Sequence, residues 1–138
     1  MSGGKERLVG CGLLWLRVLM GTGSAHHGFT KLFGGRMDQF AAGVARLGFP
    51  QPHLFAWAAA LSEFLGGILI VLGFHTRVAA YFVFTTMSVA VFLQHTHDPL
   101  SVKELALAYW TMAGTLILAG AGPYSLDGRP RRTRSLLL

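Results

Sequence analysis

The feature that most constrains the fold of this chain is the single charge inside each of two long apolar segments. Arg17 is the only charged residue of Leu8–His27, and Glu63 is the only one of His53–Gly73. An ionised side chain at the centre of a bilayer costs about 3 kcal/mol by insertion measurements. Two opposite charges in separate spans therefore favour a pair that faces the inside of a bundle. We predict direct or one-water contact between Arg17 and Glu63, near the membrane midplane.

The apolar segments also decide the class of protein. Only 13% of the 138 residues are charged, whereas a soluble domain carries about 25%. Four segments approach the roughly 20 residues that a transmembrane helix needs, and they cover residues 8–27, 53–73, 77–95 and 105–122. They are too long, and too rich in Ala, Leu and Gly, to be barrel strands. The sequence predicts an all-α integral membrane protein, in which four transmembrane helices form one domain over residues 1–127.

Residues 36–48 differ from the four spans because they are too short to cross a bilayer. Their apolar residues recur at helical spacing, at Met37, Phe40, Ala41, Val44 and Leu47. This pattern predicts one short amphipathic helix that lies in the membrane interface. Two interpretations remain open, a helix that simply packs over the mouth of the bundle and a gate over a binding site.

The orientation follows from the distribution of Lys and Arg. Four spans put both termini on one side, where seven Lys and Arg residues lie, against four on the opposite side. The positive-inside rule then places both termini in the cytoplasm. The basic segment 128–138 is expected to be a flexible tail, or a segment that touches anionic lipid headgroups. Because topology accounts for most of the +6 net charge, we predict the bilayer as a partner and no nucleic acid.

Polar residues gather at the end of the bundle away from the termini. His27 and Lys31 lie about one turn apart on the first helix, and His95 ends the third span. We predict that at least two of these three line one solvent-reachable pocket with Glu63 at its floor. The candidate ligand-binding residues are therefore Arg17, His27, Lys31, Glu63 and His95. Glu63 is also the candidate proton site. No HxxxH or ExxH spacing occurs within a helix, so no metal site is predicted.

Small residues surround both lone charges. Gly21, Ser24 and Gly28 share a helical face with Arg17, and small residues flank Glu63 in the same way, at Ala56, Ala59, Ala60 and Gly67. Small side chains let membrane helices approach closely. We therefore predict that these two faces meet and enclose a polar cavity that opens outward.

From about Leu13 to Asp127, the order and spacing of several elements resemble one known family. The elements are Arg17, His27-Gly28, Lys31-Leu32, Gly48-Phe49-Pro50, Glu63, Gly66-Gly67, Leu72-Gly73, Thr76-Arg77, Gly122-Pro123 and Ser125-Leu126-Asp127. Together they resemble the DoxX family of bacterial four-helix membrane proteins. The resemblance implies a multi-pass protein of the bacterial inner membrane. Relatives include DoxD-like subunits of archaeal thiosulfate:quinone oxidoreductase, which implies an association with membrane redox or thiol-stress systems.

Three functional hypotheses follow. The first is a redox protein, a candidate oxidoreductase subunit, that binds quinone or a small sulfur compound in the outward cavity. The second is a non-catalytic membrane anchor for a soluble oxidoreductase, and the third is a small transporter that uses Glu63 for proton coupling. The single cysteine excludes a CxxC pair, and no motif fixes a cofactor covalently. A diffusible quinone is therefore the candidate cofactor, and a soluble or membrane redox protein or a second copy of the chain is a candidate partner.

Overall fold

The computed structural model describes residues 2–128, so the predicted basic tail lies outside the described residues from 129 onward. The described part is all-helical. Its elements are α1 (Ser2–Phe33), α2 (Met37–Arg46), α3 (Pro52–Leu72), α4 (Thr76–Val89), the π-helical η1 (Ala90–Gln94) and α5 (Leu100–Ala119). Four helices are long and apolar enough to cross a membrane, namely α1, α3, α4 with η1, and α5. The prediction of four spans and one short helix is confirmed, although α1 is much longer than the predicted 8–27 segment.

Proline and glycine set most helix ends. Pro52 begins α3, where its missing N–H costs no helical hydrogen bond. Gly73 ends α3 with φ +67°, a left-handed conformation that favours glycine. Pro99 precedes α5, and Gly120 follows it. The last span was predicted to end at residue 122, but α5 ends at Ala119, where Gly120 rather than Pro123 follows it.

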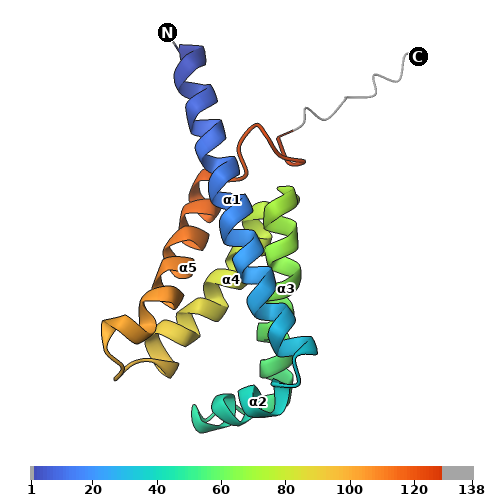
Figure 1. Ribbon diagram of the computed structural model, residues 1–138, viewed down its shortest axis with the longest axis vertical. Helices are drawn as coiled ribbons and strands as arrows, with labels where there is room; N and C mark the ends of the chain where they lie inside the picture. Colours follow the sequence, from blue (N-terminus) through green and yellow to red (C-terminus); the bar gives the residue numbers. More distant parts are fainter. Residues whose placement is uncertain (1, 129–138) are drawn as a thin grey trace, which may run out of the picture.

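The packing of α1 against α3 depends on residues without side chains. A Cβ atom at Gly67 would lie 2.5 Å from the backbone nitrogen of Ala25, and one at Gly21 would lie 2.6 Å from the carbonyl oxygen of Gly67. Both distances are far below a van der Waals contact, so the two backbones approach as closely as glycine allows. This confirms that the small-residue faces of the first two spans meet (Figure 1).

Figure 1 shows that the bundle has two distinct ends. At the N-terminal end, α1 begins and α5 ends, and the chain after α5 folds back over the turn between α3 and α4. At the opposite end, here called the α2 end, α2 lies across the bundle. Ala41 and Val44 hold it there by packing against Ala56 of α3. Gly35 and Gly48, both with positive φ, bound the α2 segment.

Candidate functional site

Glu63 is held in the bundle by two residues of α1, Lys31 and Ser24. The residue is only 1% exposed, and Lys31, in the last turn of α1, donates hydrogen bonds to both of its carboxylate oxygens at 2.7 Å. The Lys31 ammonium also lies 4.4 Å from the centre of the Phe40 ring of α2. Ser24 donates to the Glu63 carbonyl oxygen at 3.1 Å. The buried carboxylate therefore has a cation partner, as a buried charge in a membrane requires.

The predicted pair of Arg17 and Glu63 is wrong, since Glu63 pairs with Lys31 instead. Arg17 packs against Gly73 at the end of α3, ten residues from Glu63, which corresponds to about 15 Å along a helix. The prediction ended the first span at His27, whereas α1 continues to Phe33 and so brings Lys31 to Glu63. Arg17 lies near the N-terminal end of the bundle, beside Gly73, and it lines none of the hollows that contain Glu63.

Arg17 instead fastens the segment that follows α5. Its Nη2 donates to the carbonyl oxygen of Tyr124 at 2.5 Å. Within the described residues, its Nε and Nη1 have no hydrogen-bond partner, although the residue is 1% exposed. The guanidinium fills the space beside Gly73, where any Cβ atom would overlap it. Arg17 therefore lies apart from the other four candidate ligand-binding residues, at a position where it contacts Tyr124 and Gly73.

Asp127 also makes contacts at the N-terminal end of the bundle. Its two carboxylate oxygens accept hydrogen bonds from the backbone N–H groups of His75 and Thr76, both at 2.8 Å. These are free donors at the start of α4, so Asp127 caps that helix from a distant part of the chain. Burial disfavours the ionised carboxylate, but the hydrogen bonds from Thr76 and His75 outweigh it, and the pKa of Asp127 lies below its ordinary value.

Three hollows meet around Lys31 at the α2 end. The central hollow, of about 240 Å³, lies between α1, α3, η1 and α5, and His27, Lys31, Glu63 and His95 all line it. The structure thus brings His27, Lys31 and His95 together with Glu63 around one hollow, and ligand binding by these residues stays a prediction. Tyr109 of α5 also lines it, and its ring contacts the His27 ring edge-on at 5.8 Å between centroids.

The other two hollows differ in chemistry. The polar hollow, of about 440 Å³, lies between α1 and α2 and carries Arg36, Gln39 and Arg46. The apolar groove, of about 290 Å³, runs between α3 and α4 next to α2, and the buried Glu63 is one of its lining residues. Three residues line all three hollows, namely Lys31, Phe40 and Gln94. Lys31 therefore stands where the apolar groove meets the central and polar hollows, and Glu63 lines the first two of these.

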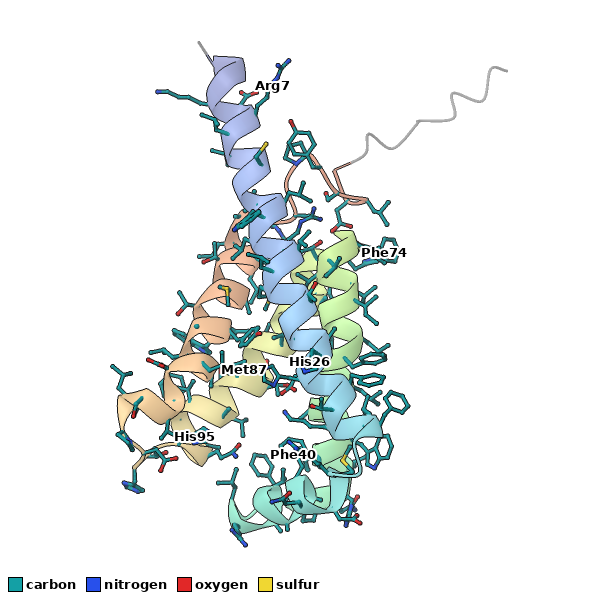
Figure 2. All side chains as sticks on the ribbon, viewed as in Figure 1. Arg7, His26, Phe40, Phe74, Met87 and His95 are labelled. Atoms are coloured by element: carbon teal, nitrogen blue, oxygen red, sulfur yellow. The ribbon has the colours of Figure 1, made fainter. Side chains whose placement is uncertain are left out.

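The π-helical turn η1 gives His95 its position. Its last hydrogen bond runs from the His95 N–H to the Ala90 carbonyl oxygen at 2.9 Å, and such turns insert an extra residue, often at functional sites. His95 Nδ1 lies 2.7 Å from Asp98 Oδ2, which leaves Nε2 for other partners. Figure 2 shows His95 and Phe40 at the same end of the molecule. Across residues 2–128, no cluster of three His, Cys, Asp or Glu side chains could hold a metal ion.

A family model and a curated relative match this chain. The DoxX family model matches residues 12–96, a range that includes Arg17, Lys31, Glu63 and His95. The inner membrane protein YphA of Escherichia coli (strain K12) is 38% identical over 111 residues, which cover 74% of this chain and 78% of YphA. No solved structure matches the chain.

Proposed function

This chain belongs to the DoxX family, and we propose that it binds a quinone at the Lys31–Glu63 pair as part of a membrane redox system. Four apolar helices and the inner membrane relative make it a multi-pass inner membrane protein. A ligand that dissolves in the bilayer suits a site inside such a bundle. We further propose that residues 1–127 form one domain, with the α2 end on the outer face.

The observation that carries this proposal is the free donor capacity of Lys31. An ammonium group has three N–H donors, and Glu63 takes two of them. The third can donate to an oxygen of a molecule in the hollows that Lys31 lines. A quinone offers a carbonyl oxygen as acceptor, and its reduced form offers a hydroxyl that can donate to Glu63. The pair can therefore hold either form of the ligand.

The surroundings of the pair fit the same ligand. A quinone is a flat apolar ring with oxygens at opposite edges, and ligand sites for such molecules combine apolar walls with a few polar groups. Phe40 and Tyr109 supply aromatic walls to the central hollow, while His27 and His95 offer ring nitrogens to a second oxygen. These residues come from α1, α2, α5 and the turn after η1, so the site depends on the complete bundle.

The redox role needs a second protein. Reduction of a quinone takes up two electrons and two protons. We propose that a partner oxidoreductase supplies the electrons, while the protons come from water in the central hollow by way of the groups that line it. In this proposal, the protein is the subunit of the membrane redox system that binds the quinone. A non-catalytic anchor or a proton-coupled transporter would not require quinone bound at Lys31.

The experiment is equilibrium binding of a short-chain quinone to the purified protein in lipid nanodiscs. The test variant combines Lys31→Met with Glu63→Gln, which removes both charges together and avoids an unpaired buried carboxylate. Lys103→Met is the matched control, because Lys103 of α5 lines none of the three hollows. We expect saturable binding to the wild type and the control, and loss of binding to the folded double variant. Equal binding to all three would contradict the proposal.

A further inference from the structure

The apolar groove exists because the side of α3 that faces α4 carries small residues. Ala58, Ala59 and Ser62 line the α3 side of the groove, and Thr85, Thr86 and Val89 line the α4 side. Small side chains on one helix opposite branched ones on the next leave a channel between the two backbones. The channel leads inward to Glu63 and Lys31.

The hydroxyl groups in the groove do not make it polar. Ser62 donates to the carbonyl oxygen of Ala58 at 2.7 Å, Thr85 to Tyr81 at 2.9 Å and Thr86 to Phe82 at 3.1 Å. Each bond closes one turn within the same helix, so the hydroxyl hydrogens are already donated. The groove therefore presents carbon surfaces, which suit a hydrocarbon chain and need no water.

The rim of the groove lies on the lipid-facing surface of the bundle. Phe55 of α3 is 40% exposed and Phe82 of α4 is 53% exposed, and both belong to helices that are long and apolar enough to span a membrane. In a membrane such exposed aromatic side chains meet acyl chains. In a membrane, a groove with this rim would open sideways into the half of the bilayer at the α2 end.

Phe40 separates this groove from the hollows that face water. It lies on α2, and its ring is one wall of the apolar groove, the polar hollow and the central hollow. The cation–π contact with Lys31 holds the ring at the junction. Among residues 2–128, no other aromatic residue lines all three spaces.

We propose that the apolar groove binds the hydrocarbon chain of the quinone, which reaches Lys31 sideways from the bilayer while Phe40 keeps water out of the groove. This inference rests on the proposed function and names the class of ligand, a quinone with a lipid chain. The quinone ring accepts a hydrogen bond from Lys31 at the inner end of the groove, and its hydrocarbon chain lies between Ala59 and Thr86.

The exclusion of water from the groove by Phe40, here called the seal, is tested by cysteine accessibility, which needs no ligand. Ala59→Cys is introduced together with Cys11→Ser, because Cys11 is the only native cysteine. A thiol without water stays protonated and reacts poorly with charged methanethiosulfonates. We expect slow modification by the charged methanethiosulfonate and ready modification by a lipid-soluble maleimide. When Phe40→Ala is added, the rate of modification by the methanethiosulfonate should rise about tenfold or more. Phe33→Ala, an exposed aromatic outside the hollows, is the control and should leave the rate unchanged. Rapid modification in the presence of Phe40 would overturn the seal.

The binding of the quinone's hydrocarbon chain is tested by filling the groove. Ala59→Trp should lower the binding of a long-chain quinone in nanodiscs about tenfold or more, while a short-chain quinone still binds. Leu65→Trp on the same helix, at a lipid-exposed position outside the groove, should change neither. Unchanged binding of the long-chain quinone to Ala59→Trp would overturn the inference and leave the proposed function standing. Loss of the proposed function would appear instead as a lack of short-chain binding to the wild type.

Discussion

Lys31 and Glu63 form an ion pair with unequal access to solvent. The Lys31 side chain is 25% exposed, whereas that of Glu63 is 2% exposed, and both N–O distances are 2.7 Å. A molecule that enters the hollows therefore meets the ammonium group before the carboxylate. The pair also joins the last turn of α1 to the middle of α3 near α2, so the proposed binding site and the packing of this end depend on the same contact.

Breaking this pair from one side should destabilise the protein more than removing it completely. Lys31→Met leaves Glu63 buried without its partner, and the loss of one partner from a buried pair typically costs about 3–5 kcal/mol. We place the expected loss near the lower limit, at about 3 kcal/mol, because Lys31 is partly exposed. The double variant with Glu63→Gln should recover most of this loss in equilibrium unfolding. A single variant as stable as Lys103→Met would show that the pair contributes nothing.

The contact of Arg17 with Gly73 predicts a large effect of one methyl group. Gly73→Ala places a Cβ atom where the Arg17 guanidinium lies, at a residue with φ +67°. Gly35→Ala is the matched control, because its φ is +69° and nothing lies within 4 Å of its Cβ position. The left-handed conformation costs about 1–2 kcal/mol in both, and the displaced guanidinium should cost Gly73→Ala about 1–3 kcal/mol more. Equal unfolding free energies for the two variants would contradict the contact.

The hydrogen bonds of Asp127 predict a loss of stability in acid. Its pKa is lower in the folded protein than the ordinary value of 3.8, so the folded state favours the ionised form. The stabilisation is complete above the unfolded pKa and disappears as pH falls through the folded pKa. The difference in Tm between the wild type and Asp127→Asn should therefore be largest near neutral pH and shrink below about pH 4. Glu104→Gln, on the exposed face of α5, is the control.

The predicted orientation can be tested by labelling in intact cells. In the Cys11→Ser background, Asp38→Cys on α2 should react with an impermeant thiol reagent, and Gly3→Cys in α1 should not. The expectation comes from the seven-to-four division of Lys and Arg between the two sides. Labelling of Gly3→Cys alone would invert the topology and place the hollows on the cytoplasmic side.

Periodicity and composition were sufficient to predict most of the fold. Apolar length gave the four spans, spacing at Phe40, Ala41 and Val44 gave α2, and small residues gave the contact of α1 with α3. Sequence spacing placed Lys31 and Glu63 in one pocket, but the direct ion pair between them was missed. The contact depends on how the last turn of α1 packs against α3, which spacing along the chain does not show.

Other parts of the site have no local signal in the sequence. Gln94 reaches the hollows at the end of a π-helical turn, and no residue pattern in the span distinguishes that turn from a regular helix. Asp127 caps α4 from 51 residues away along the chain, so only the folded structure reveals its role. Phe40 was assigned to an amphipathic helix, but its place between three hollows follows from the angle at which α2 crosses the bundle.

The most direct test of a quinone site at Lys31 is photolabelling with a light-activated short-chain quinone, followed by mass spectrometry of the labelled peptides. The site predicts adducts on residues that line the hollows, such as Phe40, Glu63 and Gln94. These adducts should disappear when unlabelled short-chain quinone is added in excess, and they should be absent from the Lys31→Met, Glu63→Gln double variant. Adducts spread over lipid-exposed residues such as Trp57 and Leu118, without competition, would contradict a quinone site.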